Sequence, residues 1–136
     1  MQKAAFSIVK YQFDKVTINL SNHKSNEISL NFDTKGVYEN ETSTYELCFS
    51  VKAFNENNIE NPFVEVECVG FFKFENVNSF EEIPDFFYRN CIAILFPFVR
   101  AYVSIITVQA NVPGVMLPTL NLTSLESTLK QNTIQK

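Results

Sequence analysis

The chain contains no tryptophan, only three glycines, one histidine and three cysteines in 136 residues. So few glycines leave no glycine-rich loop that could hold a phosphate, and the sequence shows no metal-ligand spacing. Glu65 and Glu67 share one strand face, and Cys91 and His23 are an imaginable catalytic pair. Neither arrangement supplies a base together with a group that orients it, so the sequence argues against an enzyme and predicts no cofactor.

The three cysteines, Cys48, Cys68 and Cys91, are odd in number and have no paired spacing. This pattern is typical of small buried hydrophobic residues in a reducing compartment. A zinc site built from them together with His23 is the weaker alternative, because a histidine in a polar loop is usually solvated. We therefore predict no metal site and a solvent-exposed His23.

Basic clusters and a signal peptide are also missing. The formal charge is −4 and the isoelectric point is near 5.0, which argues against binding to nucleic acid. Lys10 and Gln12 interrupt the apolar core that an N-terminal signal peptide needs, so we expect a cytoplasmic protein. In that compartment the glycosylation triplets at Asn19, Asn40 and Asn121 are chance matches.

Phenylalanine is abundant, with fourteen copies, and much of it lies in segments of alternating polarity. Alternation with a period of two predicts β-strands with one buried face. In the first segment the alternation changes phase twice, and bulges near Val9 and Asp14 would keep its apolar side chains on one face. The predicted strands are Ala4–Leu20, Glu27–Phe32, Thr44–Phe54 and Phe63–Glu75.

Residues 33–43 are mostly polar, and we interpret them as a loop with a glycine turn at Gly36. Four consecutive strands with short connections, followed by helices, predict the α+β fold class with a four-stranded antiparallel sheet. At 136 residues the chain is predicted to be a single domain, with its strands in residues 4–76.

A long helix is predicted for residues 85–110, because the apolar residues there follow a helical period. Its polar side chains Arg100, Ser104 and Thr107 form one narrow stripe. The apolar arc covers roughly 220°, whereas a helix that packs on a single core needs only ~100°. The helix therefore has a second apolar partner, which is another subunit, a ligand or a lipid bilayer.

The bilayer is the first of these alternatives to weigh, because Cys91–Ala110 has about the length that a membrane span requires. Arg100 lies in the middle of this run with Pro97 beside it, and the strands upstream need a hydrophobic partner. We therefore expect no membrane insertion. Pro97 is expected to kink or divide the helix.

The C-terminal part of the chain begins with residues 111–122, where Pro113, Gly114 and Pro118 alternate with apolar residues. This composition predicts an extended apolar connecting loop that lies along another surface. Residues 123–126 fit a capping box, so a second helix is predicted at residues 123–133. The polar tail after Gln131 is expected to fray.

Residues 94–125 read ILFPFVRAYVSIITVQANVPGVMLPTLNLTSL, and this stretch resembles the SecB family of protein-export chaperones. Residues 64–74 are similar to the fourth strand of that family. The matching motif residues are Leu95, Phe96, Pro97, Arg100, Leu120, Asn121 and Leu122. Together with the order of four strands, helix and apolar loop, the resemblance indicates a divergent SecB-like protein.

The resemblance implies an ATP-independent chaperone that binds unfolded polypeptides in hydrophobic grooves and assembles as a homotetramer, a dimer of dimers. The implied groove residues are Ile28, Leu30, Phe32, Val112, Val115, Met116, Leu117, Leu120, Leu122, Leu125 and Leu129. The implied subunit-interface residues are Phe63, Glu65, Val99, Val103 and Ile106. The alternative for the loop residues is that they seal the core.

Two features depart from the family pattern. In well-studied members an acidic surface on the sheet docks the SecA motor, and the resemblance assigns Glu65 to that surface. Lys15 and Asn19 stand where acids of the first strand are expected, and the residues after Glu126 include no acid. These departures argue against docking to SecA and favour a divergent relative, such as the SecB-like chaperones that guard an antitoxin. Protein export remains the first interpretation of the function, and the antitoxin role is the alternative. The expected guests are therefore unfolded preproteins or an antitoxin, and a structural oligomer without guests is the remaining alternative.

Overall fold

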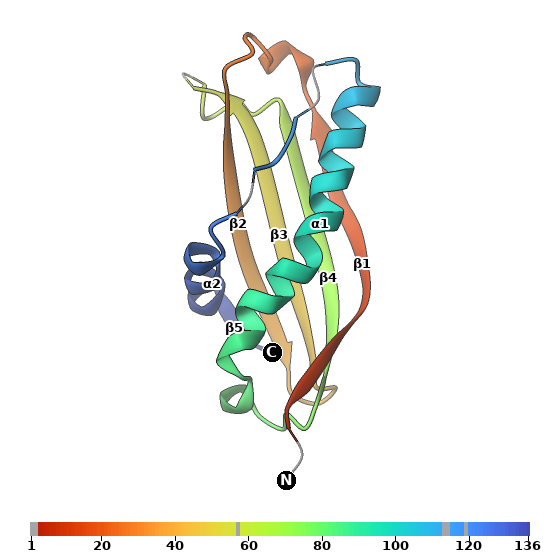
Figure 1. The fold of residues 1–136 in the computed structure, drawn as a ribbon, viewed down its shortest axis with the longest axis vertical. Helices are drawn as coiled ribbons and strands as arrows, with labels where there is room; N and C mark the ends of the chain where they lie inside the picture. The colour runs from red at the N-terminus through yellow and green to blue at the C-terminus, as the bar shows by residue number, and fades with distance from the viewer. Residues whose placement is uncertain (1–2, 57, 113–114, 119) are drawn as a thin grey trace.

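The computed structural model describes residues 3–56, 58–112, 115–118 and 120–136. It is an α+β fold in which a twisted sheet carries a long helix on one face and a short helix beside one edge (Figure 1). The elements are β1 (Ala5–Ile18), β2 (Ile28–Glu39), β3 (Thr44–Asn55), β4 (Val64–Glu75), α1 (Asp85–Gln109), α2 (Leu122–Gln131) and β5 (Thr133–Gln135). The strands lie in the order β1-β4-β3-β2-β5. The predicted fold class is confirmed, with one strand more than expected.

Strand β1 contains the two predicted bulges. Its pairing with β4 shifts register between Ile8 and Lys10 and again between Phe13 and Lys15. Each shift leaves one extra residue, Val9 or Asp14, in β1. The apolar side chains on both sides of each bulge therefore stay on the inner face of the sheet, as the changes of phase in the sequence predicted.

The inner face of the sheet forms the core together with α1. On β4 the alternate residues from Val64 to Phe74 point inward, and on β3 those from Tyr45 to Ala53 do so. Phe87 at the start of α1 lies 4.7 Å from both Tyr45 and Phe74 between ring centroids. The pair with Tyr45 is edge-to-face, whereas the pair with Phe74 is tilted. An edge-to-face aromatic pair adds ~0.5–1.5 kcal/mol beyond the burial of its area.

The interpretation of residues 33–43 as a loop is wrong for residues 33–39, and only residues 40–43 form the connecting turn. Strand β2 continues from Ile28 to Glu39 and pairs with β3 in an unbroken register. Thr34, Gly36 and Tyr38 are all buried on the inner face. Gly36 is required there, because a Cβ atom at this position would lie 1.9 Å from the hydroxyl oxygen of Tyr45. The glycine therefore leaves space for the Tyr45 side chain and does not form a turn.

Helix α1 runs without interruption through Pro97, so the proline does not divide it. By length and composition α1 could cross a membrane, with a mean hydropathy of 2.1 over its most apolar window. In the structure it lies diagonally across the inner face of the sheet (Figure 1). Val99 and Val103 are fully buried there, whereas Ile105 points away from the sheet and is exposed. Phe98 is partly exposed at the side of the helix, where its ring stacks on Tyr11 of β1 with centroids 4.3 Å apart.

The C-terminal end of α1 is a Schellman motif. Asn111 has a φ of 63°, and its N–H donates to the carbonyl of Val108 at 3.0 Å. The N–H of Val112 donates to the carbonyl of Thr107 at 3.2 Å. Asparagine tolerates this left-handed conformation better than most residues, so it ends the helix and starts the connecting segment.

Thr107 belongs to the narrow polar stripe of the helix, yet its side chain is buried. Its hydroxyl lies 2.8 Å from the carbonyl of Val103 and accepts the N–H of Val115 at 3.0 Å. A buried threonine is tolerated because the helix and the connecting segment satisfy its hydroxyl. Pro113 and Gly114, on which the loop prediction partly rested, lie outside the described residues.

Replacing Thr107 with valine tests this anchor. The substitution keeps the shape but leaves the buried N–H of Val115 without its partner, so we expect unfolding free energy to fall by ~1–3 kcal/mol. Urea denaturation measures the change. Thr128→Val is the matched control, because the Thr128 hydroxyl bonds to Ser124 near the surface, and its loss is expected to cost less than ~0.5 kcal/mol. Equal losses in the two variants would contradict the anchor.

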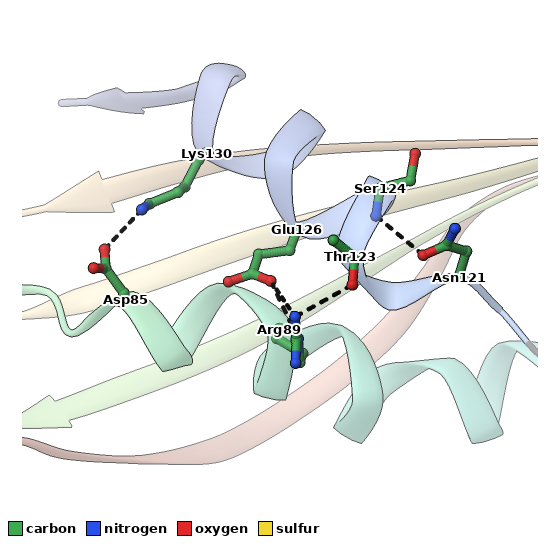
Figure 2. A network of polar contacts seen from close by, with 7 residues as sticks. All are labelled: Asp85, Arg89, Asn121, Thr123, Ser124, Glu126 and Lys130. Carbon is green, nitrogen blue, oxygen red and sulfur yellow. Dashed lines mark hydrogen bonds and ion pairs between the residues drawn. The ribbon is translucent and has the colours of Figure 1, made fainter.

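Helix α2 begins two residues earlier than a capping box at residues 123–126 would place it. The side chain of Asn121 accepts the N–H of Ser124 and is the N-cap. Glu126 instead forms an ion pair with Arg89 of α1 at 3.0 Å, and Thr123 accepts a bond from the same guanidinium at 3.3 Å (Figure 2). The capping-box prediction is therefore wrong, although the second helix is present.

A second ion pair joins the other end of α2 to the start of α1. The ammonium of Lys130 lies 2.7 Å from the carboxylate of Asp85 (Figure 2) and 5.6 Å from the ring centre of Tyr88. Beneath the two ion pairs, Leu125 and Leu129 pack into the core. Apolar contacts thus fix α2 to the sheet, and the exposed charges set its orientation along α1.

The tail after Gln131 does not fray, which corrects the prediction. Residues Thr133–Gln135 form β5, which runs parallel to β2 beside Gly36–Tyr38. The hydroxyl of Thr133 donates to the carbonyl of Leu129 at 2.7 Å and lies 2.7 Å from that of Tyr45. Backbone bonds to a sheet edge thus order a segment that has little apolar surface of its own.

Cys68 and Cys91 are fully buried, as predicted, and Cys48 is half-buried on the outer face. Burial raises the pKa of the Cys68 thiol to about 12 and raises that of Cys91 as well. His23 is not a solvated loop residue. Its ring packs edge-on against Phe63 with centroids 4.7 Å apart.

Candidate functional site

Several large apolar side chains remain exposed on α1 and on the segment that follows it. Phe98 is 40% exposed, Ile105 and Val108 are each 58% exposed, and Met116 is 75% exposed. The sheet already covers the opposite side of α1. The wide apolar arc of this helix therefore has one partner within the chain and leaves a second apolar surface open, as the sequence predicted.

A hollow of about 330 Å³ lies between α1 and the connecting segment. It is lined by Phe96, Pro97, Arg100, Ala101, Ser104 and Met116. The ring of Phe96 also contacts Phe32 of β2, with centroids 6.3 Å apart. Phe96 thus connects the hollow to the inner face of β2.

The edge of β2 that faces away from β3 is covered over only part of its length. Gly36 donates its N–H to the carbonyl of Asn132 at 3.2 Å. Tyr38 accepts the N–H of Lys136 at 2.8 Å. The backbone N–H and C=O groups of successive residues in an antiparallel strand point to opposite sides. In β2 these groups face the outer edge at the even-numbered residues and face β3 at the odd-numbered residues.

The same alternation applies to Ile28, Leu30 and Phe32, because the register of β2 with β3 has no bulge. Their N–H and C=O groups therefore face the edge, where the described part of the chain offers them no hydrogen-bond partner. Their half-buried side chains line the inner face beside it. In Figure 1 this part of β2 is the sheet edge above α2.

The start of this open edge is fixed by Asn55 at the end of β3. The buried Asn55 side chain accepts the N–H of Lys24 at 2.7 Å. It donates to the carbonyls of Ser25 at 3.1 Å and Glu27 at 2.9 Å. The loop before Ile28 is therefore held back from the edge, which keeps the open segment accessible.

The predicted groove residues divide into two groups. Four of them are buried in the core and cannot touch another molecule unless the fold opens; they are Val115, Leu117, Leu125 and Leu129. For the loop residues Val115 and Leu117, burial agrees with the alternative that they seal the core. Seven remain partly or fully accessible: Ile28, Leu30, Phe32, Val112, Met116, Leu120 and Leu122.

The predicted interface residues also need correction. Phe63, Val99 and Val103 are buried within the isolated chain, so they have no surface left to lose against a second copy. Ile106 is half-buried against the core. Near these positions on α1, the large apolar side chains that are exposed are Phe98, Ile105 and Val108.

Glu65 lies on the outer face of the sheet between two lysines. Its carboxylate is 3.6 Å from the ammonium of Lys15 and 3.9 Å from that of Lys52. The lysine on β1 thus stands directly beside the acid on β4. This part of the outer face is therefore close to neutral and is not an acidic patch.

Comparison with known proteins agrees with the sequence motif. Residues 10–132 match the family described as preprotein translocase subunit SecB. The chain belongs to the SecB family. The match includes both helices and the strands β2, β3 and β4. It leaves out β5 and the first residues of β1.

Two relatives of this SecB-family chain are informative. An uncharacterized protein of Methanocaldococcus jannaschii is 32% identical in an alignment of 112 residues. The alignment covers 76% of this chain and 68% of that protein. The SecB-like chaperone Rv1957 of Mycobacterium tuberculosis, solved in complex with a ChAD peptide from the Rv1956 HigA1 antitoxin, has a TM-score of 0.66 at 18% identity. The alignment covers 85% of this chain and 88% of that one. At this identity the likeness shows the fold.

Sequence reasoning missed three features of the SecB-family chain that shape its surface. The hydroxyl of Thr107 bonds to the connecting segment, Gly36 leaves space for the side chain of Tyr45, and the side chain of Asn55 bonds to the loop before β2. Of these, only Gly36 had a readable signal. It continues the even-numbered series of inner residues that starts at Ile28, so the strand could have been extended through it.

Proposed function

We propose that this SecB-family protein is a chaperone that binds unfolded or non-native polypeptides in extended conformation, without ATP. The open edge of β2 is the observation that carries the proposal. A guest that adds as a strand beside Ile28–Phe32 would satisfy unpaired backbone groups, whatever its sequence. The same guest would place alternate side chains on the apolar inner face.

The apolar surface next to the edge supports this assignment. It includes Phe32, Phe96 and the exposed Met116, and it accepts side chains of many shapes. Methionine is flexible and polarizable, so it adapts to different partners. Such a surface selects for apolar extended segments rather than for one sequence, as a chaperone of unfolded chains requires.

Binding of this kind makes or breaks no covalent bond, and the proposal includes no cofactor and no enzymatic step. We further propose that the protein acts in the cytoplasm as a homotetramer, a dimer of dimers. The exposed apolar residues of α1 support assembly, because leaving three large side chains in water forfeits roughly 5 kcal/mol. Several grooves on one particle would add avidity for long guests.

A narrower role is the second candidate, in which the guest is the antitoxin of a toxin–antitoxin module. The ion pairs of Glu65 with Lys15 and Lys52 support it over preprotein export, because they remove the acidity that docking to the SecA motor relies on in the family. The fold likeness to Rv1957, a chaperone solved with an antitoxin peptide, points the same way.

Suppression of aggregation tests the general proposal. A urea-denatured protein diluted into buffer is expected to stay soluble in the presence of this chain at roughly stoichiometric amounts, with no nucleotide added. Met116→Asp is expected to weaken guest affinity about ten-fold, because the guest loses apolar contact with an exposed side chain. Met116→Leu is the control and is expected to bind normally.

Circular dichroism must show that both Met116 variants fold. If the unmodified chain neither suppresses aggregation nor binds a hydrophobic dye, it is a structural oligomer and the proposal fails. If the chain protects an antitoxin segment but ignores unrelated unfolded proteins, the narrower role is the correct one.

A further inference from the structure

The β2 edge carries two neighbouring segments, and the chain's own β5 occupies one of them. Beside Gly36–Tyr38 the backbone groups of the edge pair with Asn132 and Lys136. Beside Ile28–Phe32 the same kind of groups face outward. An added strand that runs along the whole edge would therefore meet β5.

Thr34 separates the two segments. Its N–H donates to the carboxylate of Asp33 at 2.9 Å, and its carbonyl accepts from the side-chain amide of Asn132 at 3.1 Å. Both partners are side chains, which can rotate away without breaking the sheet. The side-chain contacts of Thr34 that separate the open part of the edge from the covered part can therefore break while the strands stay paired.

We propose that β5 is an internal competitor at the guest site: a guest that extends past Thr34 displaces β5 and pairs with Gly36–Tyr38 in its place. This inference rests on the proposed function. Guests confined to Ile28–Phe32 bind beside β5, and only longer guests compete with it. The C-terminal segment therefore sets a threshold of guest length.

β5 is held weakly enough to be displaced. It has three residues, and Ile134 is 62% exposed, so its release uncovers little apolar surface. Leu129 in the preceding helix is fully buried. The release of β5 therefore leaves α2 packed on the core, and local opening does not require global unfolding.

The covered segment also selects the guest. At Gly36 the missing side chain lets the hydroxyl of Tyr45 reach the edge, where it donates to Thr133. The direction follows because Thr133 gives its own hydrogen to Leu129. Burial raises the pKa of Tyr45 well above its usual range, so this donor stays protonated. A displacing guest is expected to carry serine or threonine at this register.

Peptide binding to a chain that ends at Asn132 tests the proposal. We compare fluorescent apolar peptides of about six residues, which span the open segment at ~3.3 Å per residue, with peptides of about twelve that span the whole edge. Removal of residues 133–136 is expected to tighten binding of the long peptide roughly ten-fold and to leave the short peptide unchanged.

Two further measurements keep the test decisive. Thr133→Val in the full chain is expected to tighten long-peptide binding about three-fold, while circular dichroism confirms that the chain folds. A synthetic peptide of residues 129–136 should compete with the long peptide on the shortened chain. Equal affinity of the full and shortened chains for the long peptide overturns this inference. Failure of both peptides to bind either chain overturns the proposed function instead.

Discussion

Replacing Ile105 with aspartate is expected to split the proposed homotetramer into smaller particles that remain folded. Ile105 is 58% exposed on the side of α1 that faces away from the sheet. A carboxylate there lies in water in the isolated chain, so folding is unaffected, but a second copy would have to desolvate it at a cost of several kcal/mol. Sedimentation or native mass measurement reports the size, and circular dichroism reports the fold.

Val103→Asp is the matched variant, and it is expected to affect folding where Ile105→Asp affects only the size of the particle. Val103 is two residues away on the same helix, yet it is fully buried against the sheet of its own chain. A buried, unpaired carboxylate costs a large part of the ~5–15 kcal/mol that stabilises a domain, so this variant is expected to unfold. A folded Val103→Asp chain, or an Ile105→Asp particle of unchanged mass, would show that the two faces of α1 are assigned wrongly.

Gly36→Ala is expected to destabilise the chain by ~3 kcal/mol or more, which lowers the melting temperature by roughly 10 °C. The added Cβ would lie 1.9 Å from the hydroxyl oxygen of Tyr45 and 2.3 Å from the ring carbon that bears it. Tyr45 is fully buried, so its ring has no free space into which to move. Thermal unfolding followed by circular dichroism measures the effect.

Gly70→Ala provides the control on strand β4, which lies on the other side of β3. There the added Cβ would lie 3.2 Å from a methyl group of Leu95 and from the ring of Phe72. Such contacts relax by shifts of a few tenths of an ångström, so the expected cost is below ~1.5 kcal/mol. If the two alanine variants melt at the same temperature, the tight contact between Gly36 and Tyr45 does not exist.

The course of β1 and the faces of β3 and β4 were readable from the sequence, because alternation in those segments is carried by large apolar residues. The bulges at Val9 and Asp14 followed from the same signal. The second half of β2 was missed because Thr34 and Gly36 occupy inner positions without being apolar. They are inside for reasons of space and hydrogen bonding, which hydrophobic periodicity does not record.

The candidate site was predictable only in outline. A helical wheel shows that the apolar arc of α1 is too wide for one partner, but it cannot tell which half meets the sheet, so Val103 was assigned to the wrong side. The connecting segment was recognised as apolar, yet alternate residues in it point in opposite directions, and only Met116 of residues 115–117 is exposed. The strand β5 had one apolar residue and no periodic signal.

The two long edges of this sheet are built differently, and the difference guards against polymerisation. An accepting edge on every copy invites a neighbour to insert its own border strand and start an endless head-to-tail filament. The edge strand on the other side is β1. Its two bulges shift its register twice, so it does not match the unbroken register of β2. The proposed guest edge can therefore stay open while β1 keeps the molecule from acting as a template for its own copies.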